Sequence, residues 1–294
     1  MDAHDTITGR FEANRAHLRA VAYRMLGSRS DADDAVQEAW LRLSRSDTDA
    51  IENLDGWLTT VVARVSLDML RSRKSRREEP LDAHVPDPVL SREDRADPEQ
   101  QALLAESVGL ALLVVLETLG PEERLAFVLH DMFGVPFDEI AAIVGRSTTA
   151  AYQLASRARR RVRGAPAVPD VDLSGQRKVV NAYLAAARDG DFEALLAVLG
   201  PDVVLRADTG ATGPGLSRVL RGARAVADGA ATYARLAKFA RPVLVNGAPG
   251  FIVIRERQPL AVIGFTVTEE RIAEIDILAD PTRLRELDLA ILDD

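Results

Sequence analysis

The sequence predicts a multidomain protein in which two all-α helical domains precede an α+β cone-shaped domain with a curved antiparallel sheet. Two observations predict this order: apolar residues recur with a helical period up to about residue 163, and strand-like runs dominate after about residue 200. A third is the pair of proline-bearing stretches at 78–98 and 164–175, which we interpret as linkers. The predicted domains are therefore 11–77, 99–163 and 176–294.

The first helical domain is predicted to be a bundle of three helices. Apolar residues follow helical spacing over 18–26 and again over 32–43, and a third helix is predicted from about Leu54 to Arg73. Ser30 or Asp31 is expected to cap the second helix, because a side-chain oxygen there can accept a hydrogen bond from a free backbone N–H.

Two surfaces of this bundle have an unusual composition. The second helix exposes carboxylates and amides together with one leucine, which indicates a protein contact rather than only a solvated face; the residues are Asp34, Gln37, Glu38 and Leu41. The third helix has Trp57 near its start and a basic cluster at its end. An aromatic ring with cations suits a partly melted DNA strand, although a tryptophan at this position can equally belong to the core.

The second helical domain carries the strongest local signal. A helix is predicted from about Glu99 to Leu119, and Gly120–Pro121 begins another. A short helix over 137–144, a tight turn ending at Ser147 and a longer helix to Arg163 then fit a helix-turn-helix.

The last of these helices has two distinct faces. Its apolar residues point to the core, and the opposite face has groups able to meet DNA bases, with arginines for phosphates: Thr149, Tyr152, Gln153, Ser156, Arg157 and Arg160. An ordinary solvated helix pair is the alternative interpretation. The absence of any acidic residue between Glu139 and Asp170 favours DNA binding, because a merely soluble face would mix both signs of charge.

The composition excludes several classes of protein. The 294 residues include 45 acidic and 37 basic ones, a formal charge of −8, which excludes a uniformly basic nucleic-acid coat. No cysteine is present, so disulfides, thiolate catalysis and Cys-ligated zinc are excluded. We expect no metal and no cofactor. Without a signal sequence or an apolar run of ~20 residues, the chain is expected to be soluble and cytoplasmic, with no membrane contact.

The C-terminal domain is expected to hold helices at about 176–188 and 224–238 and strands at 203–207, 242–246, 251–256, 260–268 and 271–278. The only acid–base candidates are Asp208, Asp276, Tyr183 and Tyr233, and their convergence does not follow from the sequence. Catalysis, sensing of a small molecule and regulation through protein contacts are the three alternatives. We expect the third, and no enzyme.

The helical motifs together resemble bacterial RNA polymerase sigma factors of the sigma-70 class, extracytoplasmic-function subfamily. The resemblance rests on YRMLGSRSDADDAVQEAWLRL, on GWLTTVVARVSLDMLRSRKSRR and on LGPEERLAFVLHDMFGVPFDEIAAIVGRSTTAAYQLASRARRRVR. It implies core RNA polymerase and promoter DNA as partners. The polymerase contacts implied are the clamp helices of the largest subunit and the flap of the second-largest.

The resemblance also implies which residues make each contact. Those implied to bind core polymerase are Asp33, Asp34, Gln37, Glu38 and Leu41. Those implied to open and read the −10 element are Asn53, Asp55, Trp57, Arg64, Arg71, Arg73 and Lys74. Those implied to read the −35 element are Ser147, Thr148, Thr149, Tyr152, Gln153, Ser156, Arg157 and Arg160. A stand-alone DNA-binding repressor is the alternative, disfavoured by the net negative charge.

The C-terminal half resembles the SnoaL-like, polyketide-cyclase-like branch of the nuclear transport factor two-like cone fold. This resemblance implies that the domain regulates the sigma factor in cis, and a small-molecule ligand is left open. The candidate regulatory residues are Asp208, Thr209, Gly210, Asp280 and Pro281. The family's Asp-Gly-Gly-Gly-Lys segment is replaced by Asp208-Thr209-Gly210-Ala211-Thr212, and its Trp-Leu-Pro-Glu-Pro signature by His84-Val85-Pro86-Asp87-Pro88. We further expect residues 176–294 to fold independently.

Overall fold

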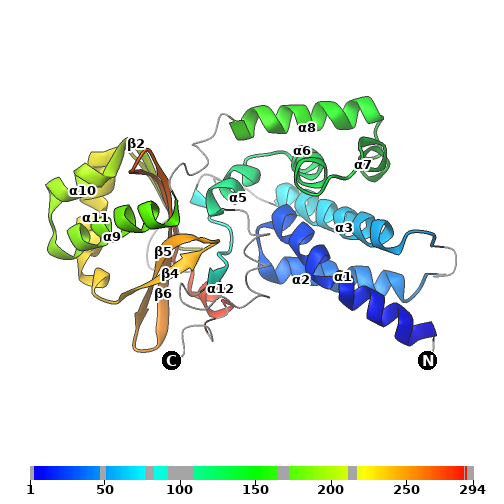
Figure 1. Cartoon of the computed structure of the whole chain (residues 1–294), viewed down its shortest axis with the longest axis horizontal. Helices are drawn as coiled ribbons and strands as arrows, with labels where there is room; N and C mark the ends of the chain where they lie inside the picture. The colour runs from blue at the N-terminus through cyan, green and yellow to red at the C-terminus, as the bar shows by residue number, and fades with distance from the viewer. Residues whose placement is uncertain are drawn as a thin grey trace. The chain divides into compact units, whose positions relative to one another are not determined.

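The computed structural model describes residues 3–46, 51–76, 83–91, 109–163, 172–210, 217–287 and 289 (Figure 1). The chain forms two compact units, Met1–Glu79 with Val115–Gly164 and Pro80–Val114 with Ala165–Asp294. The described part of the first unit is helical, and the second is built around one sheet. The second unit therefore includes most of the stretch that the sequence predicts to be a linker.

Three helices form the N-terminal bundle: α1 (Ala3–Leu26), α2 (Arg29–Leu43) and α3 (Leu54–Arg76). Helix α1 stops at Gly27, whose φ of +69° lies in the left-handed region that glycine adopts without strain. The cap of α2 is Ser28, not Ser30 or Asp31 as expected. Its backbone is extended and its hydroxyl accepts a hydrogen bond from the Asp31 amide at 3.4 Å.

The core of this bundle has the predicted periodicity. Most residues of α1 and α2 that follow the helical period are fully buried, including Leu18, Met25 and Leu43, whereas Trp40 is half-buried. The third helix is less completely buried, because Trp57 and Met69 are only half-buried. Trp57 therefore keeps part of its indole ring accessible near the start of α3.

The helix-turn-helix part confirms the predicted boundaries. It contains α6 (Pro121–Phe127), η3 (Val128–Met132), α7 (Phe137–Val144) and α8 (Thr148–Arg163), preceded by α5 (Leu110–Glu117). Gly145, at φ +68°, ends α7, and the Ser147 hydroxyl accepts a hydrogen bond from the Ala150 amide at 3.2 Å at the start of α8. The part of the predicted helix before residue 109 lies outside the described residues.

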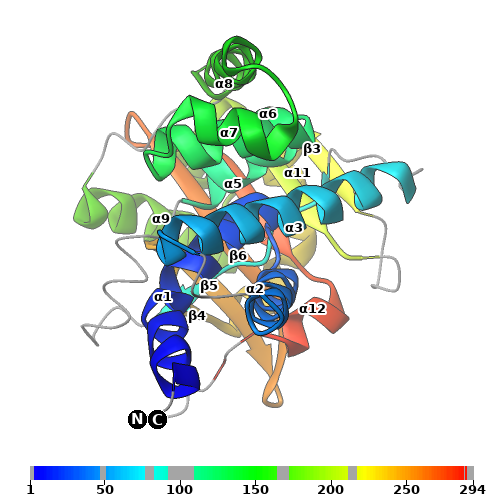
Figure 2. The same cartoon turned by 90° about the vertical axis from the view of Figure 1, so that its right-hand side faces the viewer.

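Within the first unit, the N-terminal bundle and the helix-turn-helix part are packed together. Helices α6 and α7 contact α3 on one side and α8 on the other, so they lie between these two helices in both views (Figure 2). Arg124 of α6 is 3% exposed, and its guanidinium donates to the backbone oxygen of Arg24 in α1 and to Glu117. A buried arginine with such partners joins the two parts of the unit.

The second unit contains a seven-stranded sheet in the order β1-β4-β5-β6-β7-β2-β3. Its strands are β1 (Leu90–Ser91), β2 (Leu199–Asp208), β3 (Arg218–Arg221), β4 (Ala240–Val245), β5 (Ala248–Arg255), β6 (Gln258–Thr268) and β7 (Arg271–Leu278). The expectation of an antiparallel sheet needs correction, because β2 pairs with β7 in parallel and the sheet is mixed. The two short strands β1 and β3 were not expected.

Helices cover one face of this sheet. They are α9 (Leu173–Asp189), α10 (Phe192–Val198) and α11 (Ala223–Ala237), and they bury a core that includes Val180, Leu195, Phe265 and Ile275. The opposite face packs against α12 (Pro281–Arg285) and against Val85, Leu90 and Leu110. Where residues 83–91 are described, they are thus part of the domain's core and edge, not a solvated linker as expected.

Candidate DNA-binding and polymerase-binding surfaces

The outward face of α8 lies as predicted. Ala151, Leu154, Ala155 and Ala158 are buried, whereas Thr149, Gln153 and Arg160 are exposed and Ser156 is half-buried. Ser147 and Thr148 are exposed at the start of the helix. Tyr152 is 54% exposed, and its ring packs edge-on against Phe137 of α7 at 5.5 Å between centroids. Packing of this kind limits the conformations of an exposed side chain, which lowers the entropic cost of a contact.

The arginines of α8 fall into two groups. Arg157 and Arg161 both pair with Glu123 of α6, at 3.0 and 2.5 Å, and Arg159 pairs with Asp131 at 2.5 Å. Arg160 is exposed and makes no ion pair with any described residue. Arg157, predicted to hold phosphate, pairs with Glu123 of α6 in the free protein, and its contact with DNA stays a prediction. Sequence spacing located these cations on the helix but did not reveal their carboxylate partners.

The acidic side of α2 keeps most of its predicted residues accessible. Asp34 and Gln37 are exposed, and Leu41 is 38% exposed among them. Glu38 is half-buried and pairs with Arg42 at 2.9 Å. Asp33, at the edge of the same surface, is paired with Nε and Nη2 of Arg19, each at 2.7 Å. The leucine among carboxylates therefore forms a mixed apolar and acidic surface.

The start of α3 is shaped by Asn53 and Asp55. The Asn53 side chain accepts from the Gly56 amide at 3.1 Å, and a Cβ at Gly56 would lie 2.8 Å from the Asn53 amide nitrogen, so this cap requires glycine. Asp55 accepts from the Asn14 side chain at 2.9 Å. Trp57 lies one residue beyond Gly56, at the edge of this site.

The arginines along α3 contact protein groups. Arg64 donates to the Ala142 backbone oxygen in α7 at 3.3 Å, and Arg71 pairs with Glu122 of α6 at 2.7 Å. Arg73 pairs with Asp31 and donates to the Leu26 backbone oxygen. The Lys74 side chain lies outside the described residues. The basic cluster that the sequence identified is thus occupied by partners that the sequence did not reveal.

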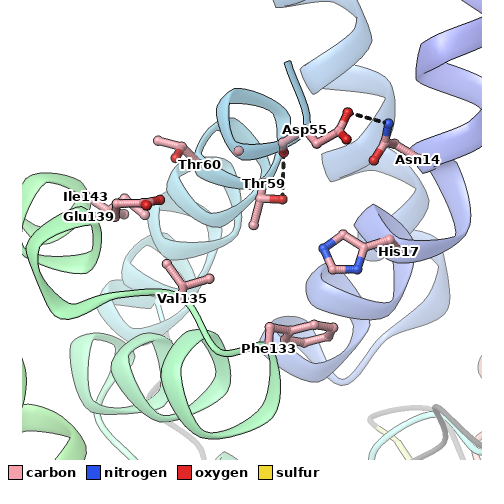
Figure 3. Close-up of a pocket in the computed structure, with 10 residues that line it drawn as sticks. Asn14, His17, Asp55, Thr59, Thr60, Phe133, Val135, Glu139 and Ile143 are labelled. Atoms are coloured by element: carbon pink, nitrogen blue, oxygen red, sulfur yellow. Dashed lines mark hydrogen bonds between the residues drawn. The ribbon is translucent and has the colours of Figure 1, made fainter. Parts of the chain in front are cut away.

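A hollow of about 320 Å³ separates the start of α3 from the helix-turn-helix part (Figure 3). Asn14, His17, Asp55, Thr59 and Thr60 line it on the bundle side, and Phe133, Val135, Glu139 and Ile143 line it from the segment around α7. The predicted −10 residue Asp55 therefore lines this hollow, with its carboxylate directed at Asn14.

The second unit surrounds Asp208, one of the candidate regulatory residues, with His84, Val85 and Arg283. Asp208 accepts from the Val85 amide at 3.1 Å and from Arg283 at 2.8 Å, and it lies 3.0 Å from Nδ1 of His84. Burial would raise the pKa of Asp208, but His84, the Val85 amide and Arg283 hold it well below the usual value. Arg283 also donates to Asp87 at 2.6 Å and to the Val85 backbone oxygen at 2.5 Å.

The remaining regulatory candidates build the loops around Asp208. Asp280 caps α12 by accepting from the Thr282 and Arg283 amides, and Pro281 occupies its first turn. Gly210, at φ +65°, approaches the Asp280 carboxylate so closely that a Cβ would clash with it. The Thr209 amide donates to Ser217 at 3.1 Å. The segment His84–Pro88, noted in the sequence, contributes to this site. Its partner Arg283 belongs to the segment 279–287.

The acid–base candidates do not converge. Asp208 and Asp276 lie on the sheet face that packs against Val85 and Leu90, whereas Tyr183 packs against Phe265 in the core beneath the helices. Burial raises the pKa of Tyr183 to about 12. The Tyr233 side chain lies outside the described residues. The three described candidates, Asp208, Asp276 and Tyr183, therefore do not form one acid–base site.

Asp276 has neighbours that differ from those of Asp208. It is 2% exposed and accepts from Arg206 at 3.1 Å, while Glu274 beside it is 1% exposed and accepts from the same guanidinium at 3.0 Å. Burial raises the pKa of Asp276 to about 7, the Arg206 charge opposes this shift and the Glu274 carboxylate adds to it. One arginine thus serves two buried carboxylates.

The described residues include no group of three or more histidine, aspartate or glutamate side chains placed to hold a metal ion. No helix among them is long and apolar enough to cross a membrane.

Comparison with known families assigns the helical part of the chain. Residues 10–76 match the family described as Sigma-70 region 2, and residues 109–162 match Sigma-70, region 4. The first match contains α2 and α3, and the second contains the helix-turn-helix part. Together, the fold and these surfaces define a promoter-recognition sigma factor of RNA polymerase.

Individual relatives make the assignment more specific. The ECF RNA polymerase sigma factor SigJ of Mycobacterium tuberculosis (strain H37Rv) is 46% identical over 213 residues, which is 72% of this chain and 68% of SigJ. The probable ECF RNA polymerase sigma factor SigI of the same organism is 35% identical over 296 aligned positions and 98% of both chains. The chain belongs to the extracytoplasmic-function (ECF) RNA polymerase sigma factors.

A solved relative also covers the C-terminal domain. The crystal structure of Mycobacterium tuberculosis SigJ matches with a TM-score of 0.76 at 34% identity, over 96% of this chain and 99% of that chain. The match confirms two helical sigma regions followed by a SnoaL-like domain with a curved, mixed sheet. Sigma factors are transcription initiation factors rather than enzymes, and regions 2 and 4 imply core RNA polymerase and promoter DNA as partners.

Proposed function

We propose that α8 of this sigma factor reads the −35 element, and that Asn53, Asp55, Trp57 and the arginines of α3 open and read the −10 element. The observation that carries the proposal is the exposed outward face of α8. There Thr149, Tyr152 and Gln153 offer hydrogen-bonding groups on one side of a helix whose other side is buried. A helix of this kind fits the major groove, and Arg160 near its end can hold a phosphate.

We propose that α2 docks on the clamp helices of the largest polymerase subunit, and the helix-turn-helix part on the flap of the second-largest. Support comes from the exposed Asp34, Gln37 and Leu41, which combine negative charge with one apolar side chain. Surfaces of this composition suit a partner that is basic around an apolar patch.

The test adds purified core polymerase to the full chain and measures binding to promoter fragments. Promoter binding that appears only with core enzyme supports the proposal. Equally strong binding by the chain alone would favour the alternative, a stand-alone DNA-binding protein.

We also propose that the SnoaL-like domain regulates the sigma factor in cis by holding the segment that connects regions 2 and 4. Three contacts support this: Asp208 with His84 and Val85, Arg283 with Asp87, and the reciprocal hydrogen bonds between Val89 and Asn246 at 2.8 and 3.0 Å. A connector held at one end restrains how far the two promoter-reading parts can separate.

The regulatory proposal is tested by comparing core affinity and transcription for the full chain and for a chain truncated near residue 170. Release of the restraint should raise apparent core affinity through a population shift. Identical core affinity and identical transcription for the two chains would show that the domain does not regulate the sigma factor.

A small ligand of this domain remains a second candidate because of one observation. The ends of α9 and α11 enclose a hollow of about 590 Å³ lined by Arg188, Ala234, Arg235 and Lys238, three cations without a carboxylate. Arg188 is fixed there by hydrogen bonds to the Ala237 and Ala240 backbone oxygens. Any such ligand would be an anion, and calorimetry with inorganic phosphate tests the site.

A further inference from the structure

Two adjacent carboxylates at the start of α6, Glu122 and Glu123, form ion pairs with four arginines. Glu123 pairs with Arg157 at 3.0 Å and with Arg161 at 2.5 Å. Glu122 pairs with Arg71 at 2.7 Å and with Arg146 at 3.4 Å. Acidic residues in a first helical turn are usual, because they complement the helix dipole. The choice of partners goes beyond this general role.

The two carboxylates differ in what they join. Both partners of Glu123 lie on α8, so its ion pairs stay within the helix-turn-helix part. Glu122 instead joins Arg146, in the turn before α8, to Arg71 on α3. It is therefore the carboxylate that links the proposed −35-reading part to the proposed −10-reading helix. Both lie in the same compact unit.

This link conflicts with the proposed role of Arg71. Glu122 accepts from Nη2 of Arg71 and places a negative charge beside that guanidinium, which repels an approaching phosphate. Release of Arg71 by Glu122 would therefore favour phosphate binding, and a separation of α3 from α6 would produce that release. Arg64, which donates to the Ala142 backbone oxygen in α7, makes a second contact that would be lost in the same movement.

We propose that Glu122 is a positioning residue that competes with promoter phosphate for Arg71 and so latches the sigma factor in a closed form. The inference rests on the proposed function of α3. The side chains of Arg71 and Glu122 are 47% and 25% exposed, so the pair is weak. Exposed pairs of this kind correspond to about a two- to fivefold change in an equilibrium. A latch of that strength can be opened by polymerase and DNA.

The experiment measures the closed fraction in the free, full-length chain. Because the sequence has no cysteine, spin labels can be attached at Ala13→Cys in α1 and Asp138→Cys in α7, both exposed positions. Glu122→Gln should increase the ratio of long to short label distances by about two- to fivefold. Glu123→Gln is the matched control and should leave that ratio unchanged. The charge swap Arg71→Glu with Glu122→Arg should restore part of the wild-type ratio, because the exchanged pair re-forms but the cation at 122 also faces Arg146.

A second readout separates the latch from simple destabilisation. With core polymerase, Glu122→Gln should speed promoter-complex formation, whereas the charge swap should not, because it lacks the Arg71 cation. An unchanged distance ratio in Glu122→Gln, an equal shift in Glu123→Gln, or a wild-type chain that is already open would overturn the latch. If wild-type holoenzyme binds no promoter, the proposed function fails, and the label distances still decide whether the latch exists.

Discussion

The helices α3 and α8 both carry arginine clusters, but the two clusters have different surroundings. On α8, the paired arginines find carboxylates within the helix-turn-helix part, and Arg160 stays exposed. On α3, Arg64, Arg71 and Arg73 contact groups of α7, α6 and α2. In the free protein the arginines of the proposed −10 helix therefore contact other helices of the unit, whereas those of the proposed −35 helix pair within the helix-turn-helix part or, for Arg160, with no described residue. A basic run in a sequence is thus no measure of the cations available to DNA.

The largest effect is expected from removing the contact of α2 with polymerase, because we expect polymerase binding to separate α3 from α8. Asp34→Lys with Glu38→Lys should weaken core binding by about tenfold or more, because it places like charges at a basic partner surface. Pull-down of core enzyme by the folded double variant measures the effect. Binding equal to wild type would show that α2 is not the docking helix.

Next in size is the effect of Gln153→Ala on base selection by α8. If Gln153 makes a bidentate contact, its loss should reduce discrimination at one −35 position by ~1–3 kcal/mol and leave the others unchanged. Selection from promoters randomised at the −35 element measures this. An unchanged profile would mean that another face of α8 meets the bases.

A smaller effect should distinguish the exposed from the paired arginines of α8. Arg160→Ala should weaken holoenzyme binding on all promoters and reduce the salt slope by about one unit. Arg157→Ala should change the slope less, because Glu123 already neutralises that guanidinium. Promoter binding over a series of salt concentrations compares the two. Equal slopes would show that Arg157 leaves Glu123 in the complex.

In the second unit, Asp208 and Asp276 differ in their partners, and we expect the difference to make the free energy of unfolding depend on pH. The folded pKa of Asp276 is about 7 against an ordinary 3.8, so the native state holds a proton that the unfolded chain releases between these values. The free energy of unfolding should therefore fall as pH rises from about 4 to about 7.

Hydrogen exchange of β7 amides, corrected for intrinsic rates, measures this dependence in the full chain. Asp276→Asn should remove the decline and leave the acid-side loss that comes from Asp208, whose pKa is lowered. A decline that persists in the variant would assign the proton to another group.

Local signals account for what the sequence predicted well. Gly145 and Ser147 fix the turn between α7 and α8 by their own backbone and side-chain chemistry, so these boundaries agree with the structure. The buried period of α2 and the exposed face of α8 follow equally from spacing along a single helix. Such features need no partner distant in sequence.

Features that depend on distant partners were not predicted. Strand β1 is two residues in a proline-rich run, and it becomes a strand only because β4 pairs with it. The parallel pairing of β2 with β7 has no local signature either. The same applies to the site, because Glu123 lies 34 residues from Arg157 and Arg283 lies 196 residues from Asp87. Helical periodicity places a side chain on one face of a helix but does not identify the residues that this face contacts.

Strand β1 has a consequence for the solubility of the SnoaL-like domain. It pairs with β4 through Leu90 and Ser91, and Val85, Leu90 and Leu110 cover the adjacent apolar face. A fragment beginning at residue 172 would expose the backbone edge of β4 and that face to water. Unprotected edges of this kind template strand-to-strand aggregation. The domain therefore depends on sequence that lies between the two sigma regions, and expressed alone from residue 176 it would be prone to self-association.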